Sequence, residues 1–225
     1  DAGVALSAIL KLWKERQAQR KAPSKTKALK AWWMDIEKWK SRDCLAFRQD
    51  KKTIKPQYAI QRLFELTKKR KTFITTEVGQ HQMWAAQFYR FDEPNRWMTS
   101  GGLGTMGYGL PAAIGVQLGN PDGLVIDIAG EASILMNIQE LSTAVQYRLP
   151  VKLFIINNQY MGMVRQWQEL LHGGRYSESY TDSLPDFVKL AGAYGMAGLR
   201  VTDPAKVDDT IKEMMAIDGP VIVDV

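Results

Sequence analysis

Hydrophobic and polar residues follow two different patterns along this chain, and the pattern changes near Thr72. Before that point, apolar residues recur at helical spacing, which predicts helices over residues 4–18, 28–41 and 56–69. After it, short runs rich in β-branched residues predict strands at 72–76, 124–129, 151–157 and 221–225. Segments of helical periodicity separate these runs, at 110–118, 133–147, 163–171, 185–194 and 204–216.

The alternation of strands and helices predicts an α/β fold with a parallel sheet flanked by helices on both faces, because the strands are apolar on both sides. Ligands bind such sheets at the carboxyl ends of the strands. We therefore expect function in the loops after Thr76, Ser100, Ala129 and Asn157. The segment 133–147 should form one helix with a single continuous apolar face.

The pattern also divides the chain into regions. Residues 1–20 are predicted to be the tail of a preceding domain. Residues 21–55 are predicted to form a linker and helical connection, in which Lys21-Ala-Pro-Ser-Lys25 is an exposed stretch. Residues 56–225 then form the α/β domain, which begins on a helix with Pro56 near its first turn.

Composition excludes several classes of function. No apolar run among the 225 residues reaches the ~20 residues that cross a bilayer, so we expect no membrane partner. One cysteine, Cys44, excludes an internal disulfide framework, and two histidines leave little for a histidine metal centre. The net charge of +6 could indicate nucleic acid, but the basic residues crowd the first thirty positions without interleaved aromatic residues. We expect solvated helices and linker there, no nucleic acid partner, and a reducing, cytosol-like compartment.

A glycine-rich stretch, SGGLGTMGYGLP at residues 100–111, precedes a predicted helix. Glycine permits backbone conformations and close approaches that other residues do not. Gly102, Gly104 and Gly107 also match the G-x-G-x-x-G pattern of dinucleotide-binding loops. Taken alone, the stretch leaves three interpretations open: a nicotinamide or flavin site, another ligand loop, or a tight turn without a ligand.

Acidic and amide side chains follow two consecutive predicted strands. Glu131 lies at the end of one strand and opens a helix, and Asn158 ends the next strand. A strand–helix–strand unit brings consecutive strand ends side by side, so we expect these two residues to converge. Carboxylate and amide oxygens are hard ligands that suit Mg²⁺, which often bridges protein and phosphate oxygens.

Together these motifs resemble the thiamine-diphosphate signature, which begins Gly-Asp-Gly or Gly-Asp-Ala and ends Asn-Asn. VGQHQMWAAQ at 78–87, TSGGLGTMGYGLP at 99–111 and GMVRQWQ at 162–168 are similar to acetohydroxyacid synthase (acetolactate synthase) catalytic subunits. The resemblance covers residues 30–225 and implies the diphosphate-binding domain of that family. Alternatives are another thiamine-diphosphate decarboxylase or ligase, and a dinucleotide-binding module; metal-dependent binding of thiamine diphosphate would separate the last from the others.

The resemblance implies roles for residues of this chain. The diphosphate would be lined by Val78, Gly79, Gln80, His81, Ala132 and Ser133, with Gly130 among the cofactor-binding residues. Mg²⁺ would be held by Glu131, Asn158 and the backbone carbonyl of Tyr160. The aminopyrimidine would meet Gly104 and Met106, the thiazolium would lie beside Met163 and Val164, and Trp167 would wall the substrate pocket.

The chain departs from the family at Glu131, where the family has aspartate. The longer side chain puts the metal geometry in doubt, since Mg²⁺ keeps ligands near ~2.1 Å. The resemblance also implies an amino-terminal pyrimidine-binding domain with an activating glutamate and a carboxy-terminal tail, neither matched here. We therefore expect no catalytic residue in this chain and no activity of the chain alone.

For the whole enzyme, the resemblance implies pyruvate and 2-oxobutyrate as substrates, and acetolactate formation in branched-chain amino acid biosynthesis. It also implies a homodimer or tetramer, with a regulatory subunit as a further partner. FAD, a structural cofactor of the family, should bind weakly or not at all to this part of it. The location would be the cytoplasm or an organellar stroma or matrix.

Overall fold

The structure is a computed structural model that describes residues 1–19 and 27–225. These residues fall into two units, Asp1–Ala46 and Phe47–Val225. The predicted exposed stretch Lys21–Lys25 lies outside the described residues.

The first unit contains the helices α1 (Ala2–Gln19) and α2 (Lys27–Lys40), whose described residues include no buried side chain. Apolar side chains of both helices are exposed. Examples are Leu10 and Trp13 of α1 and Trp32 and Trp33 of α2. On α2, Trp32 also packs edge-on against Trp39, with ring centroids 5.5 Å apart. No helix of the described residues is long and apolar enough to cross a membrane.

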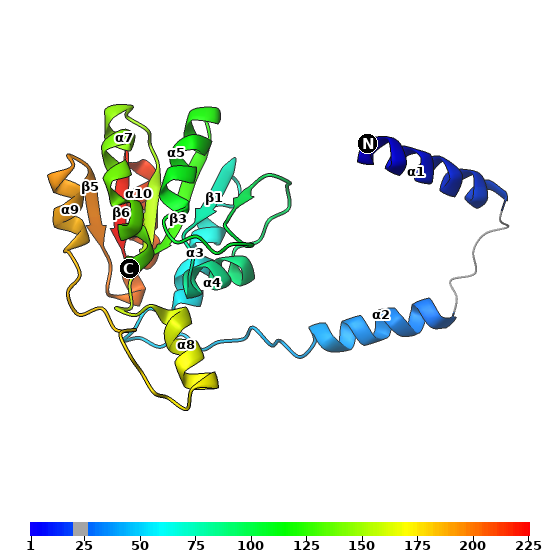
Figure 1. Cartoon of the computed structure of the whole chain (residues 1–225), viewed down its shortest axis with the longest axis horizontal. Coiled ribbons are helices and arrows are strands. Elements are labelled where there is room, and N and C mark those ends of the chain that lie inside the picture. The colour runs from blue at the N-terminus through cyan, green and yellow to red at the C-terminus, as the bar shows by residue number, and fades with distance from the viewer. Residues whose placement is uncertain (20–26) are drawn as a thin grey trace. The chain divides into compact units, whose positions relative to one another are not determined.

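The second unit is built on a sheet of six strands in the order β2-β1-β3-β4-β6-β5, with every described pairing parallel (Figure 1). The strands are β1 (Thr72–Thr76), β2 (Trp97–Met98), β3 (Leu124–Gly130), β4 (Lys152–Ile156), β5 (Ala197–Arg200) and β6 (Val221–Asp224). The α-helices are α3 (Pro56–Thr67), α4 (Gln80–Phe88), α5 (Gly109–Gly119), α6 (Glu131–Ile134), α7 (Leu141–Gln146), α8 (Gly162–Leu171), α9 (Phe187–Ala193) and α10 (Val207–Ala216). The predicted α/β class is confirmed.

Helices cover both faces of this sheet. Ile126 and Ile128 of β3 pack with α3, α4 and α10 in one core. Val125 and Ala129, which alternate with them, pack with α5, α7 and α9 in the other. Side chains point to opposite faces at alternate positions of a strand, so β3 has apolar residues on both faces, with Asp127 as the exception. Because both faces are buried, polar side chains of this sheet can reach solvent at the ends of the strands.

The order of the strands creates a gap between the loops that follow β1 and β3. From β1 the chain passes through α4 to the edge strand β2, and then returns through α5 to β3, on the other side of β1. The helices α4 and α5 lie on opposite faces. Such a reversal is a topological switch point, where open α/β sheets bind their ligands.

The segment 133–147 is not one helix, contrary to the expectation from its apolar periodicity. It consists of α6, a 3₁₀ segment (Leu135–Glu140) and α7, and Asn137 interrupts it with φ −133° and ψ 34°. The apolar residues still pack into one core, since Ile134 and Leu141 are both buried there. Periodicity recorded the buried face correctly and missed the break, whose cause is a contact described below.

Three elements were not assigned from the sequence: α4, β2 and β5. The first residues of α4 face the strand ends, whereas Ala85 is buried in the core. The apolar residues of α4 therefore do not lie along a single face of the helix. The strands β2 and β5 are short, with two and four residues, and neither contains a fully buried residue. Short and half-buried edge strands carry little periodic signal.

Gly109 and Gly115 give a matched test of packing within α5. A Cβ on Gly109 would lie 2.6 Å from the backbone nitrogen of Glu77, whereas one on Gly115 would meet nothing within 4 Å. We expect Gly109→Ala to lower the free energy of unfolding by about 1–3 kcal/mol through overpacking. Gly115→Ala should raise it by up to about 1 kcal/mol, because alanine is the better helix former. Chemical denaturation measures both; equal effects would contradict the close packing at Gly109.

Candidate functional site

One cavity of about 220 Å³ opens at the carboxyl ends of β1, β3 and β4. This volume exceeds what a metal ion and a few water molecules, at ~30 Å³ each, would fill. Each predicted cofactor, metal and substrate-pocket residue lines it. They are Val78, Gly79, Gln80, His81, Gly104, Met106, Gly130, Glu131, Ala132, Ser133, Asn158, Tyr160, Met163, Val164 and Trp167. Sequence reasoning missed four others that line it as well: Trp84, Ile156, Met161 and Gly162.

The register of the sheet explains why these residues meet. Gly130 of β3 lies opposite Ile156 of β4, so Glu131 and Asn157 leave the sheet at the same level. The helices α4 and α8 begin at Gln80 and Gly162, both of which line the cavity. Free backbone N–H groups at helix N-termini favour anions. The cavity therefore offers backbone donors beside one carboxylate.

Gly162 allows two parts of the site to approach closely. A Cβ at this position would overlap the amide group of Gln80. Gln80 in turn donates from Nε2 to Oε1 of Gln166, at 3.0 Å. These contacts join the start of α4 to α8. The sequence signal was available, since a glycine opens the helix that follows the Asn-Asn pair, but without the fold nothing identifies what it approaches.

His81 lies between two glycines. A Cβ on Gly79 would lie 2.7 Å from His81 Cε1, and one on Gly130 would lie 2.5 Å from His81 Nδ1. Burial lowers the pKa of His81 to about 4, against a smaller opposite effect from the backbone of Glu77. The imidazole is thus neutral near pH 7, and its buried Nε2 has no hydrogen-bond partner among residues 1–19 and 27–225. With its proton on the nitrogen that faces Glu77, the ring presents Nε2 as an acceptor and carries no positive charge.

Glu131 is 2% exposed, and its buried Oε1 has no hydrogen-bond partner in the part of the chain that the structure describes. Burial raises the pKa of this carboxyl, its own backbone N–H and those of Tyr160 and Asn158 lower it, and the nearby Asp224 raises it again. An unpaired buried carboxylate is costly unless something compensates it. A bound cation would supply that compensation.

Other oxygen atoms complete a donor set beside Glu131. Asn158 Oδ1 accepts a hydrogen bond from the Tyr160 N–H at 3.1 Å, and a carbonyl-type oxygen retains a second lone pair. Arg165 stacks on the Tyr160 ring at 4.2 Å, and the Tyr180 ring lies 5.0 Å from it. In residues 1–19 and 27–225, no three His, Cys, Asp or Glu side chains gather around one point. A cation here would rely on one carboxylate with amide and carbonyl oxygens, a set that suits Mg²⁺.

Glu77 holds the glycine-rich loop, a role that the sequence did not reveal. The side chain is fully buried, and its Oε2 accepts from Gly107 N at 2.6 Å and its Oε1 from Leu110 N at 3.1 Å. These N–H groups lie at the start of α5, where a carboxylate is favoured by the helix dipole. Burial raises the pKa of Glu77, while backbone N–H groups from Gly107 to Leu110 lower it.

Asn137 holds the same loop from the other side. Its Nδ2 donates to the Gly107 carbonyl at 2.6 Å. To reach this carbonyl, Asn137 leaves helical geometry, which accounts for the break between α6 and α7. Gly107 has φ +86°, a conformation that favours glycine. Met106, which lines the cavity, therefore stands on a loop fixed from two directions.

Asp127 lies in the middle of β3 and is fully buried. Its Oδ1 accepts from the Thr75 hydroxyl at 2.9 Å, and its Oδ2 has no hydrogen-bond partner among the described residues. Burial and then the neighbouring Glu77 charge raise the pKa of Asp127 well above its ordinary value, against a smaller lowering by Thr75. Of the two carboxyls, Asp127 is the protonated one, because Glu77 has several backbone donors and Asp127 has one hydroxyl.

Comparison with known families gives one match that covers most of the α/β unit. Residues 77–225 match the family described as "Thiamine pyrophosphate enzyme, C-terminal TPP binding domain". The matched range begins at Glu77, and it contains every residue that lines the cavity.

Individual relatives are similar over a longer part of the chain. The large subunit of acetolactate synthase isozyme 3 from Escherichia coli is 47% identical over 207 residues, covering 92% of this chain and 36% of the relative. The mitochondrial catalytic subunit of acetolactate synthase from Saccharomyces cerevisiae is 48% identical over 198 residues, covering 86% and 29%. A large subunit from Buchnera aphidicola reaches 52% over 184 residues. The chain thus spans about a third of the length of the relatives that it matches.

The buried Asp127 should make stability depend on pH. In the folded chain its pKa lies above the ordinary 3.8, so unfolding ionises it and becomes more favourable as the pH rises past that value. Asp127→Asn keeps an acceptor for Thr75 and cannot ionise. As the pH rises above that value, the variant should become progressively more stable to unfolding than the unsubstituted chain, because only the unsubstituted chain must keep a buried acid protonated. Urea unfolding at several pH values measures this, with the exposed Asp122→Asn as control; parallel pH curves would contradict the assignment.

Proposed function

Since the chain belongs to the thiamine pyrophosphate enzymes, through their C-terminal TPP-binding domain, we propose that the cavity described above binds the diphosphate end of thiamine pyrophosphate together with Mg²⁺. One observation carries the metal: the buried Glu131 has an unpaired carboxylate oxygen at the strand end beside Asn158. A dinucleotide would need Gly102, Gly104 and Gly107, of which only Gly104 lines this cavity.

In this proposal each part of the site meets one part of the cofactor. The side chains of Glu131 and Asn158 and the carbonyl of Tyr160 hold Mg²⁺. Backbone N–H groups at the starts of α4 and α8 receive the diphosphate, and the neutral His81 beside them adds no charge. The diphosphate contacts come from Val78, Gly79, Gln80, His81, Gly130, Ala132 and Ser133.

The apolar side of the cavity orients the rings. Met106 supports the aminopyrimidine with Gly104, and the fixation of its loop by Glu77 and Asn137 keeps it in place. Met163 and Val164 flank the thiazolium. Trp167, one helical turn after Met163, lines the cavity yet is 57% exposed, so it is free to wall the pocket for an incoming substrate.

We further propose the activity of acetolactate synthase for the whole protein to which this domain corresponds. When bound, thiamine pyrophosphate supplies the chemistry that decarboxylates pyruvate and joins the two-carbon unit to a second 2-oxo acid. The residues of this chain bind and orient, and the activating glutamate belongs to the pyrimidine-binding domain. Residues 1–20 would end a middle domain that holds FAD, and residues 21–55 would connect it to the TPP domain at 56–225. The whole protein would form a dimer or tetramer with a regulatory subunit. Its location would be the cytoplasm or an organellar matrix.

Calorimetric titration tests the proposed site directly. Thiamine pyrophosphate should bind the chain in the presence of Mg²⁺ and not in its absence, and NAD should not bind. Glu131→Gln should weaken binding at least about tenfold, about 1.4 kcal/mol, because it removes the charge that faces the metal. Glu213→Gln, on the exposed surface of α10, is the matched control. Binding that ignores both Mg²⁺ and the substitution at Glu131 would refute the site.

Glu131→Asp tests the length of the carboxylate. Glutamate is one methylene longer than the aspartate of the family pattern, and Mg²⁺ demands short, regular bonds. We expect the aspartate variant to tighten Mg²⁺-dependent binding of thiamine pyrophosphate about fivefold, or about 1 kcal/mol. The same titration measures it, and equal or weaker binding would show that the backbone here already suits glutamate.

A further inference from the structure

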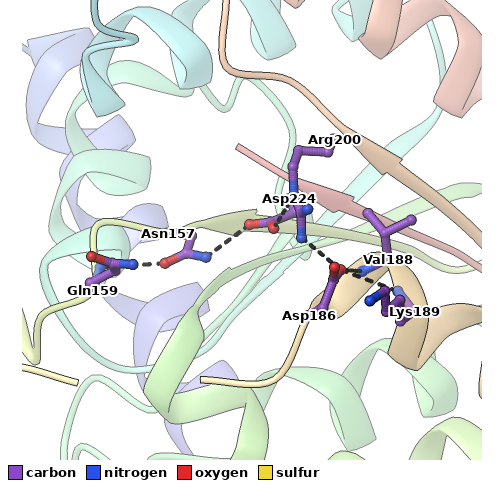
Figure 2. Close-up of polar contacts among 7 residues, drawn as sticks. All are labelled: Asn157, Gln159, Asp186, Val188, Lys189, Arg200 and Asp224. Carbon is purple, nitrogen blue, oxygen red and sulfur yellow. Dashed lines mark hydrogen bonds and ion pairs between the residues drawn. The ribbon is translucent and has the colours of Figure 1, made fainter. Parts of the chain in front are cut away.

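A chain of polar contacts runs from the start of α9 to the end of β4 (Figure 2). Arg200 donates from one terminal nitrogen to Asp186 Oδ1 at 2.7 Å, and from Nε to Asp224 Oδ2 at 3.0 Å. Asn157 Nδ2 donates to Asp224 Oδ1 at 3.0 Å. Asp186 also caps α9, accepting from Val188 N at 3.0 Å. The start of α9, the strands β5 and β6, and the residue after β4 thus meet at one side-chain network.

Asp224 is the centre of this network. Its side chain is 8% exposed, and its two oxygens have separate partners, one from Arg200 and one from Asn157. A buried carboxylate is costly unless it is paired and hydrogen-bonded. Because Arg200 is anchored to Asp186 as well, the position of Asp224 is fixed, and with it the position of the Asn157 amide.

Asn157 connects the network to the turn after β4 through its own hydrogen bonds. Its Oδ1 accepts from the Gln159 N–H at 3.3 Å, and its own N–H donates to the Val225 carbonyl at 3.0 Å. Gln159 adopts φ +63°, a left-handed conformation that a non-glycine residue takes only when its surroundings hold it. The residues on either side of Gln159 are Asn158 and Tyr160, which carry the oxygens assigned to the metal.

We propose that Asn157 is a positioning residue for the metal site, and that the Asp186–Arg200–Asp224 network sets the geometry of Asn158 and Tyr160 through it. This inference rests on the proposed function. Mg²⁺ tolerates little deviation in ligand placement. The groups that orient metal ligands are worth about 10–100-fold in affinity when they are removed. Asn157 is not among the residues that line the cavity, so its effect on the site passes through the turn.

An exchange of the two side chains gives a sharp test. Asn157→Asp keeps the acceptor for Gln159 but places a second carboxylate against Asp224. Asp224→Asn leaves its amide unable to satisfy both Asn157 and Arg200. In the double variant Asn157→Asp/Asp224→Asn, the new amide at 224 donates to the carboxylate at 157, and its oxygen accepts from Arg200. The network is then restored with its donor and acceptor reversed and its net charge unchanged.

The first measurement is the Mg²⁺ concentration that half-saturates thiamine pyrophosphate binding. Each single variant should raise it about 10–100-fold, and the double variant should return it to within about threefold of the unsubstituted chain, under 1 kcal/mol. Asp208→Asn breaks a bidentate pair with Arg62 elsewhere, and serves as the control for general destabilisation. It should lower stability without changing the Mg²⁺ requirement. Equal Mg²⁺ requirements in all variants, or no recovery in the double variant, would overturn the proposal.

Amide hydrogen exchange of residues 157–161 in the ligand-free chain separates this inference from the proposed function. Exchange should accelerate about tenfold or more in both single variants and return toward the original rate in the double variant. If the unsubstituted chain bound no thiamine pyrophosphate, the proposed function would fail, and the inference about the metal site would fail with it. If the chain bound it and exchange of 157–161 stayed the same in all variants, only the role of Asn157 would be refuted.

Discussion

Burial of a parallel sheet on both faces is the constraint on which the rest of this structure depends. A strand with no solvated face has no room for charge along its length, so charged groups collect where the strands end. Glu77, Glu131 and Asp224 all lie at carboxyl ends. At the opposite end, Lys152 donates to the carbonyls of Ile217 and Gly219 at 2.7 and 2.8 Å, and burial lowers its pKa to about 8.

Asp127 shows what the constraint costs where it is broken. It lies within β3, has one hydroxyl partner, and its pKa is raised well above the ordinary range, so that it stays neutral beside Glu77. A neutral Asp127 leaves Glu77 as the charged member that binds the backbone of the glycine-rich loop. The protonation of one buried residue is in this way linked to the position of a loop that lines the cavity.

The binding residues themselves are held by groups outside the cavity. Glu77 and Asn137 hold the loop of Met106, and Asn157 holds the turn of Asn158 and Tyr160. In both cases a side chain satisfies backbone groups that no regular element pairs. Such groups restrict a loop at a strand end without adding bulk to the cavity, which a ligand needs free.

The sequence by itself determined the fold class, the strands β1, β3, β4 and β6, and the helices other than the ones noted above. It did so because the spacing of apolar residues along the chain indicates which face of each strand or helix is buried. It also predicted which loops face a ligand, since parallel strands place their carboxyl ends together. The resemblance in 78–87, 99–111 and 162–168 indicated the family, and the match over residues 77–225 confirmed it.

Only the tertiary structure decided the partners of the buried polar groups. Periodicity shows that a position is buried but not what lies opposite, so the contacts of Glu77 with Gly107 and of Asn157 with Asp224, 30 and 67 residues away, left no local signal. The break at Asn137 follows the same logic, because its helix pattern is intact and the deviation comes from the distant Gly107 carbonyl. Hydrogen-bond partners depend on the order of strands in space, which the local pattern of residues does not encode.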